Sequence, residues 1–499
     1  SHNSKAMFVR GAVVVTWFAL LLLRCSFARA DSVSRDAPVL ILGAGVAGAK
    51  VALDLHRNGI DNFLVIEANE RVGGRLRQVK FGPDNLTVEA GANWMQGYRD
   101  ENSVSTFADK HIAFKGIATD FDDVYFVEDG VLVDDEVADP VWNRAGKAVD
   151  AILQLAQDQS RRPGGPEYDT DVRSALLFTA GWEANSPIEK AAMKFEIDLE
   201  YGVPGSAMSV HSLSPLYYPD AAETVDFFVN DKRGFEELVR VMLQRAGIDN
   251  VDEPGSKLRL GSPVAAIRYN DSAVSVRLRS GEIIKGSAAV STFSVGVLQE
   301  SLMRPREETR VKFRPELPAA KRLAIAKYEL TDYHKVYIQF NKPLFTNKDP
   351  LFLLPLDCSE GGTFISLHNL NKKGYLPGSN AVLLDSVDAY ARETNCQAER
   401  ETLREALKYV SKAAGLEVTM DDVRAWYIPN WRQDPFFKGS FSVRTTGMTS
   451  ADFEAFNRPL GALFFAGEAH APDGLSGYVQ GAWSSGRATA EEVLKYLKR

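Results

Sequence analysis

The chain has 499 residues, of which 45% are hydrophobic, 25% charged and 10% aromatic. This composition is ordinary for packed globular domains, and it excludes a largely disordered chain, a collagen-like repeat and a protein with many membrane spans. At roughly 150 residues per domain, the length predicts two to four domains or one large composite. The formal net charge of −8 disfavours nucleic acid as a partner.

Residues 1–30 have the pattern of a removable leader. Six residues that resemble an expression-tag remnant precede Met7, Arg10 then precedes a 13-residue apolar run, and Ala-Arg-Ala ends the stretch. A basic start, a short apolar run and an A-x-A site are typical of a secretory signal peptide, whereas a membrane span needs about 20 apolar residues. We therefore expect a secreted protein with no integral membrane span in the mature chain. The leader carries four basic residues and no acid, so 54 basic and 66 acidic residues remain, or −12.

Two cysteines and two glycosylation sequons are relevant to the expected secretion. Cys358 and Cys396 follow the leader and are not spaced as a metal site, so we expect no metal. One disulfide or two free thiols are both open readings of this pair. Asn85-Leu86-Thr87 and Asn270-Asp271-Ser272 would be glycosylation acceptors in a secreted chain.

The mature chain opens with a βαβ unit. The apolar run at 38–42 predicts a buried parallel strand, a helix follows, and 62–67 predicts the second strand. Gly43, Gly45 and Gly48 fill G-x-G-x-x-G between strand and helix, where glycines allow a tight turn, close approach to a pyrophosphate and close helix packing. Glu67 ends the second strand, where a carboxylate can accept ribose hydroxyls. Strand, glycines, helix, strand and acid in this order predict a dinucleotide site.

The later elements alternate between helical and strand patterns. Residues 100–220 predict a mostly helical region, 233–247 a further helix, and 258–298 a small antiparallel sheet that returns to a buried sheet. Strands are predicted at 335–340, 351–356, 381–387 and 463–467, with helices at 404–414 and 481–499. This is an α/β protein. Its doubly wound, Rossmann-type nucleotide-binding domain is built from discontinuous segments, and a second domain has a mixed sheet flanked by helices.

Several motifs resemble those of the flavin-containing amine oxidases, in particular secreted polyamine oxidases. They are GAGVAG, ERVGGR, EAGANWMQG, FFVNDKRGFEELV, YHKVYIQF, WRQDPFFKGSFS, FFAGEAH and GYVQGAWSSG, and they occur in the order of that family. The resemblance implies an FAD-binding domain at 37–100, 221–300 and 430–499. It implies a substrate-binding domain at 101–220 and 301–429.

The resemblance also implies which residues hold FAD. They are Gly43, Gly45, Gly48, Glu67, Gly74 and Arg75 around the adenosine and diphosphate, Val264 at the adenine, Glu468 near the ribityl and diphosphate, and Trp431 and Val479 near the flavin ring. Some relatives attach FAD through a cysteine in the segment similar to FKGSFS. This chain has no cysteine there, so noncovalent FAD is expected.

Lys335 matches the family lysine that holds a water against flavin N5. Phe441 and Tyr478 match the aromatic pair that flanks the substrate, and Tyr333 matches a further aromatic residue of the site. The implied reaction is oxidation of a C–N bond in a primary or secondary amine. Hydride passes to flavin N5, the imine is hydrolysed to an aldehyde, and O2 is reduced to H2O2.

One position departs from plant polyamine oxidases. Gln96 stands where they carry a glutamate, and a second tunnel acid falls near Glu200 or Tyr201. Asp120, Asp122 and Asp123 are possible substitutes, although a solvated loop explains them as well. A related flavoenzyme acting on another amine, an amino acid or a biosynthetic intermediate therefore stays open, as does a flavin-binding module without oxidase activity. The sequence does not fix the amine, the bond cleaved or the oligomeric state.

Overall fold

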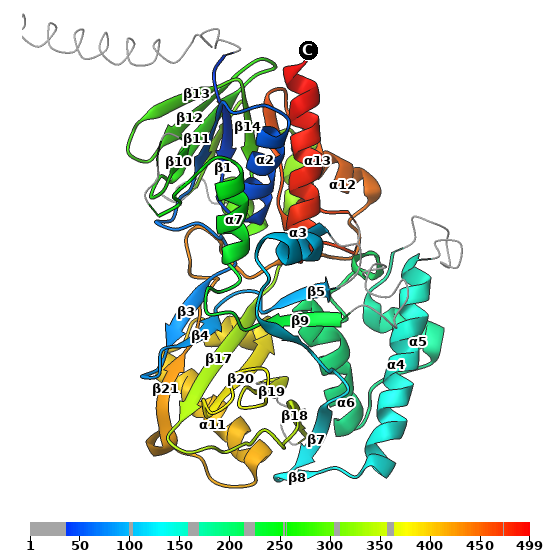
Figure 1. The fold of residues 1–499 in the computed structure, drawn as a ribbon. Helices are drawn as coiled ribbons and strands as arrows, with labels where there is room; N and C mark the ends of the chain where they lie inside the picture. The colour runs from blue at the N-terminus through cyan, green and yellow to red at the C-terminus, as the bar shows by residue number, and fades with distance from the viewer. Residues whose placement is uncertain are drawn as a thin grey trace, which may run out of the picture.

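The computed structural model describes residues 36–98, 103–157, 169–213, 225–252, 255, 257–303, 310–356, 364–472 and 474–499. It has two lobes, stacked one above the other in Figure 1. The upper lobe carries the N-terminal βαβ unit and the C-terminal helix, and the lower lobe holds the largest sheet. The predicted leader lies outside the described residues.

A five-stranded parallel sheet forms the centre of the upper lobe. Its order is β10-β2-β1-β14-β23, and every neighbouring pair is parallel. Its strands are β1 (Val39–Leu42), β2 (Phe63–Ile66), β10 (Leu258–Arg259), β14 (Ala288–Ser291) and β23 (Leu463–Phe465). All four residues of β1 and of β2 are buried, as expected for strands covered on both faces. The predicted Rossmann-type sheet from discontinuous segments is confirmed.

Helices and a second sheet cover this sheet. Helices α2 (Val46–Arg57), α7 (Glu237–Arg245) and α13 (Val479–Leu497) lie together in Figure 1. α13 packs closely on α2, because a Cβ added to Gly486 would lie 2.6 Å from the carbonyl oxygen of Ala47. The second sheet has the order β13-β12-β11-β15. Its strands are β11 (Val264–Tyr269), β12 (Val274–Leu278), β13 (Ile283–Gly286) and β15 (Lys312–Arg314).

The lower lobe is built on a seven-stranded mixed sheet with the order β21-β17-β20-β19-β18-β7-β8. Its strands are β7 (Val124–Glu128), β8 (Val131–Leu132), β17 (Tyr333–Phe340), β18 (Phe352–Pro355), β19 (Ser366–Asn369), β20 (Ala381–Val387) and β21 (Val423–Tyr427). α11 (Glu399–Ala414) packs on one face. Because side chains alternate along a strand, Val336, Ile338 and Phe340 face α11, whereas Tyr333, Lys335 and Tyr337 face the opposite side.

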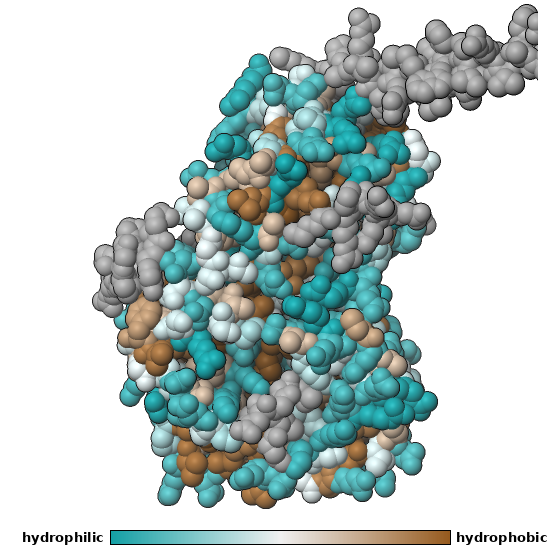
Figure 2. Space-filling view, turned by 180° about the vertical axis from the view of Figure 1, so that it is seen from behind, coloured by the Kyte–Doolittle hydropathy of each residue, from teal (hydrophilic) through white to brown (hydrophobic). Residues whose placement is uncertain are grey.

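Helices and short sheets complete the chain. The remaining helices are α3 (Ser103–His111), α4 (Asp135–Gln157), α5 (Val172–Ala180), α6 (Pro187–Met193), α8 (Val295–Met303), α9 (Ala319–Ala326), α10 (Asp388–Thr394) and α12 (Ser450–Asn457), with a π-helical turn at Lys194–Leu199. The remaining strands are β3 (Gln78–Phe81), β4 (Leu86–Glu89), β5 (Trp94–Tyr98), β6 (Gly116–Ala118), β9 (Val225–Val229), β16 (Tyr328–Leu330) and β22 (Ser442–Arg444). Hydrophilic residues cover most of the face in Figure 2, with hydrophobic residues in separate small patches.

The region 100–220 differs from its prediction. It contains helices α3 to α6, but it also contributes strands β6, β7 and β8, which the helical patterns around them obscured. β5 and β6 both pair with β9. One sheet therefore contains a strand from before residue 100, a strand from within 100–220 and a strand from after residue 220. The predicted domain boundaries stay a prediction.

Candidate active site

One cavity collects the candidate residues. All of them except Gly48 line it: Gly43, Gly45, Glu67, Gly74, Arg75, Gln96, Val264, Tyr333, Lys335, Trp431, Phe441, Glu468, Tyr478 and Val479. They come from segments far apart in the chain. Gly48 lies behind the cavity instead, where an added Cβ would be 2.0 Å from the carbonyl oxygen of Gly43. Its lack of a side chain lets α2 pack closely on the strand-to-helix turn.

The glycine-rich turn between β1 and α2 leaves its backbone accessible to a ligand. Gly43 has φ +122°, a conformation that side chains rarely adopt, and Gly45 caps α2 without a side-chain hydrogen bond. Cα of Gly45 lies 3.1 Å from the Cβ position of Gly74, so two glycines face each other across the cavity wall. The first turn of α2 carries no acid. A helix N-terminus in such a glycine cradle fits the phosphates of a dinucleotide.

Hydrogen bonds hold the carboxylate of Glu67 in place at one end of the cavity. Oε2 accepts a 2.7 Å hydrogen bond from the backbone N–H of Ala44, and Oε1 accepts from both the backbone and side-chain nitrogens of Asn69. A carboxylate has about four acceptor positions. One is left for a ribose hydroxyl. The donor set at this end of the cavity therefore fits FAD.

Arg75 and Glu468 join the two ends of the chain. Nη1 of Arg75 donates to Oε1 of Glu468 at 2.9 Å and to the carbonyl oxygen of Ser440 at 2.8 Å. The other oxygen of Glu468 accepts from the hydroxyl of Ser442 and from the backbone N–H of Gly477. This carboxylate is buried. Three chain segments are thus fixed around one edge of the cavity.

Lys335 is buried in β17 beside the cavity. Its Nζ donates to the carbonyl oxygen of Gly91 and to Oδ1 of Asn93. An ammonium has three N–H donors, so one is left for a third acceptor. Burial lowers the pKa of Lys335 to about 8, while the nearby carboxylates of Asp385 and Glu89 act in the opposite direction.

Aromatic rings surround the cavity in front of Lys335. The rings of Tyr333 and Phe441 lie 5.9 Å apart, and Nζ of Lys335 lies 6.0 Å from the ring centre of Tyr333. Tyr478 is the residue before α13, and its hydroxyl donates to Glu200. Nε1 of Trp431 donates 2.9 Å to the carbonyl oxygen of Ala90, next to the backbone that accepts from Lys335.

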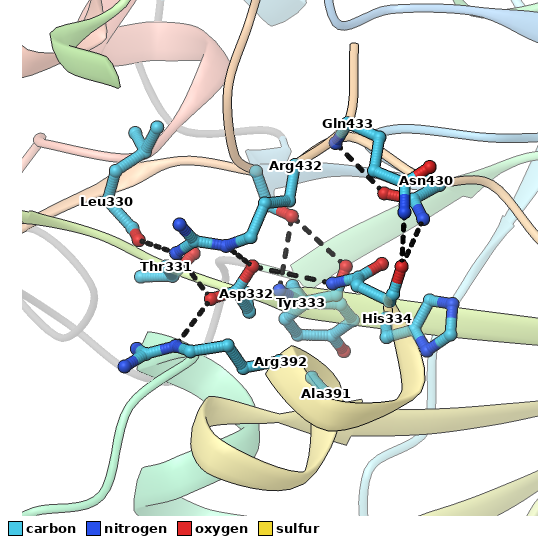
Figure 3. A network of polar contacts seen from close by, with 12 residues as sticks. Leu330, Thr331, Asp332, Tyr333, His334, Ala391, Arg392, Asn430, Arg432 and Gln433 are labelled. Carbon is cyan, nitrogen blue, oxygen red and sulfur yellow. Dashed lines mark hydrogen bonds and ion pairs between the residues drawn. The ribbon is translucent and has the colours of Figure 1, made fainter. Parts of the chain in front are cut away.

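A buried carboxylate connects the start of β17, which carries Tyr333, to the turn that carries Trp431. Asp332 immediately precedes Tyr333, and its side chain is fully buried between two arginines (Figure 3). Nε of Arg392 donates at 3.1 Å, and Nε and Nη2 of Arg432 donate to separate oxygens of the carboxylate. Arg432 is the neighbour of Trp431. The network therefore positions Tyr333 and Trp431 relative to each other.

Some lining residues were not among the candidates. Asp226, Trp94, Phe352 and His368 line the cavity. Asp226 lies on β9 and accepts a 3.0 Å hydrogen bond from the backbone N–H of Gly97, next to Gln96. No sequence motif marks it, because its position depends on the pairing of β5 with β9. From the acidic run at 120–123, Phe121 lines the cavity rather than the acids.

The family model described as flavin containing amine oxidoreductase matches residues 46–494. The chain belongs to this family. This flavin-dependent amine oxidase is 26% identical to polyamine oxidase 1 of Zea mays over 96% of this chain and 95% of the relative. It is 27% identical to polyamine oxidase 6 of Oryza sativa subsp. japonica over 92% and 91%. The family membership establishes FAD as the cofactor and O2 as the usual electron acceptor.

Solved structures agree with this oxidase in fold. Cyclohexylamine oxidase from Brevibacterium oxydans IH-35A superposes with a TM-score of 0.70 at 18% identity, covering 93% of this chain and all of that one. Putrescine oxidase bound to putrescine superposes with a TM-score of 0.68 at 16% identity, covering 92% and 99%. Among the described residues of the oxidase, no helix is long and apolar enough to cross a membrane, and no cluster of His, Cys, Asp and Glu could hold a metal ion.

Proposed function

We propose that this amine oxidase acts on polyamines and oxidises a C–N bond beside Lys335. The observation that carries the proposal is the convergence of Lys335, Tyr478 and Phe441 with Glu200 and Asp226 on the one cavity that also fits FAD. Lysine, aromatic rings and acids each have a separate task there.

The aromatic residues and the lysine serve the reacting end. The rings of Phe441 and Tyr478 hold the alkyl chain and its nitrogen by packing and cation–π attraction, which places the α C–H bond for transfer. Lys335 holds a water through the N–H that Gly91 and Asn93 leave available. Glu67, Arg75 and Glu468 would help to hold noncovalent FAD, which would supply the redox chemistry: a hydride acceptor for the α C–H bond and, with O2 as the final acceptor, formation of H2O2. Water then hydrolyses the released imine to an aldehyde and a free amine, or ammonia from a primary amine.

The acids support a cationic substrate. Glu200 and Asp226 both line the cavity, so Gln96 does not leave it without carboxylates. An amino-acid substrate would need an arginine for its carboxylate. Arg75 is the one arginine among the described lining residues, and it is bonded to Glu468 at the cofactor end. A polyamine therefore fits better than an amino acid.

Anaerobic bleaching of the flavin tests the proposal. Spermidine, spermine and 1,4-diaminobutane should bleach the yellow holoenzyme without O2, whereas benzylamine and alanine should do so slowly. Faster bleaching by benzylamine or alanine would indicate the alternative of another amine or an amino acid. A flavin that no amine reduces would indicate a binding module without oxidase activity.

Secretion is part of the proposal. Its support is the pattern of residues 1–30, together with two sequon asparagines that are exposed, Asn85 and Asn270. Cys396 is exposed and forms no disulfide within the described residues, and Cys358 lies outside them. Expression in a secreting host should yield protein in the medium that begins near Asp31 and loses mass on treatment with an N-glycosidase. Retention in the cell with the leader intact would contradict it.

A further inference from the structure

Three neighbouring strands place a row of polar side chains on the cavity side of the large sheet. Lys335 on β17 is paired with Asp385 on β20, and Asp385 is paired with Ser366 on β19. Directly paired residues point to the same face, and so do residues two apart, so His368 shares this face. His368 lines the cavity. Two strand spacings separate β19 from β17, or roughly 10 Å.

His368 is held at one ring nitrogen. Nε2 lies 2.7 Å from Oδ2 of Asp385 and 3.0 Å from the hydroxyl oxygen of Ser366. Every contact that the described residues make with the His368 nitrogens is at Nε2. A carboxylate at this distance favours the proton on Nε2, so Nδ1 carries the lone pair. With this tautomer, the ring presents a hydrogen-bond acceptor at Nδ1.

Aromatic rings wall this part of the cavity. The ring of His368 lies 4.6 Å from that of Phe352 in an edge-on arrangement and 5.8 Å from that of Trp94. Phe121 stacks on Phe352 at 5.5 Å, and all three aromatic residues line the cavity. Aromatic faces around a polar acceptor form a favourable environment for an ammonium group.

The buried acid also needs an explanation. The side chain of Asp385 is fully buried, and it lies beside the ring of His368, the hydroxyl of Tyr333 and the ammonium of Lys335. Burial of a carboxylate costs free energy unless donors and cations face it. A negative charge behind His368 is useful when a cation binds in front of it.

We propose that His368, with Asp385 behind it and Trp94, Phe121 and Phe352 around it, binds a second amino group of the substrate. The inference rests on the proposed function, because the first amino group is the one oxidised beside Lys335. The separation of the two strands makes His368 too remote to hold that reacting nitrogen. The subsite therefore selects di- and polyamines over monoamines.

Matched pairs of amines test the subsite. The probes are linear diamines of four, six and eight carbons and the monoamines of the same lengths. They are titrated by anaerobic calorimetry into holoenzyme whose flavin has first been reduced with dithionite, so that binding is measured without turnover, and flavin reduction of the oxidised enzyme by the same amines is followed separately. His368→Leu should weaken the binding of the preferred diamine about 10- to 100-fold, as expected for loss of a hydrogen bond to a charged group. Binding of the matching monoamine should change less than about 2-fold. Asp385→Asn should act in the same direction, because an amide can donate to Nε2 and move the ring proton to Nδ1.

His334→Gln is the control. Like His368, His334 is buried, but it lies on β17 and on the opposite face of the sheet, where its Nδ1 contacts Thr394. This variant should leave the preference for diamines unchanged. Equal losses for diamine and monoamine in His368→Leu, or no loss for either, would overturn the subsite. If wild-type flavin is reduced by no amine, the proposed function fails, while the calorimetric comparison of diamine with monoamine still decides the subsite.

Discussion

The hydroxyl of Tyr478 donates a 2.6 Å hydrogen bond to Oε1 of Glu200. Glu200 follows the π-helical turn of the lower lobe, whereas Tyr478 precedes α13 of the upper lobe, so this bond connects the lobes at the cavity wall. Burial and the nearby Glu200 carboxylate hold the pKa of Tyr478 well above its usual value, so the phenol stays the donor. The bond fixes an aromatic ring and a negative charge relative to each other.

Two substitutions separate these roles. Glu200→Gln keeps an oxygen that can accept from Tyr478 but removes the charge, so the KM for a polyamine should rise about 10-fold or more while the melting temperature changes little. Tyr478→Phe keeps the ring and removes the donor, so the free energy of unfolding should fall by about 1.5–3 kcal/mol. Steady-state kinetics and thermal unfolding measure the two effects. Equal KM changes in both variants would show that the charge of Glu200 does not act on the substrate.

Asp226 should supply the negative charge that is missing from the cavity because Gln96 stands in place of a glutamate. Asp226→Asn retains an oxygen for the backbone N–H of Gly97, so its effect should come from the lost charge. We expect a higher KM for spermidine with kcat nearly unchanged, since uniform binding is lost. Gln96→Glu in the Asp226→Asn background should restore much of the affinity. No change in KM for Asp226→Asn would remove this residue from substrate binding.

The sequence predicted the cofactor end more completely than the substrate end. Gly43, Gly45 and Glu67 lie close together in sequence, so local spacing was enough to place them. Lys335 and Phe441 could be paired only through the resemblance to a family. Asp226 and His368 carry no motif, because their place in the cavity follows from the register of β9 and β19.

Dependence on pairing with a distant strand also explains why the sequence did not predict β7 and β8. β7 has five residues and β8 has two, both lie close in sequence to the 23-residue helix α4, and both residues of β8 are exposed. Such short segments show no clear alternation, so the neighbouring helical pattern dominates the prediction. Their position is fixed by the pairing of β7 with β18, which is 228 residues away by the register of Val124 with Phe352.

The Asp332 network should be a main determinant of stability near the site. Asp332→Asn leaves Arg392 and Arg432 without their carboxylate. Because both guanidinium groups are partly exposed, we expect the free energy of unfolding to fall by about 1.5–3 kcal/mol, as for the loss of hydrogen bonds to a charged group. Arg392→Gln should cost less, because Arg392 is half-exposed and Arg432 remains. Chemical denaturation of the holoenzyme measures both. The reverse order of stability would contradict this view of the network.

Lys335→Met should keep FAD bound and slow a half-reaction of the flavin. Glu67, Arg75 and Glu468, which we expect to hold FAD, are other residues of the cavity wall, so the ratio of flavin to protein should not change. Stopped-flow measurement of anaerobic reduction and of reoxidation by O2 shows which step slows. Wild-type rates in both half-reactions would exclude Lys335 from the chemistry.

The lowered pKa of Lys335 also predicts how stability changes with pH. The pKa is about 8 in the folded protein against an ordinary 10.5, so between these values the unfolded chain binds more protons and stability rises with pH. Below pH 8 both states are protonated, and the burial of charge costs about 3 kcal/mol. The free energy of unfolding of Lys335→Met relative to wild type should therefore fall by about 3 kcal/mol between pH 8 and 10.5. The acceptors Gly91 and Asn93 lose a donor at every pH, which shifts this difference without changing its slope. Denaturant unfolding of both proteins across this range measures the slope, and a difference that stays constant would show that Lys335 does not titrate there.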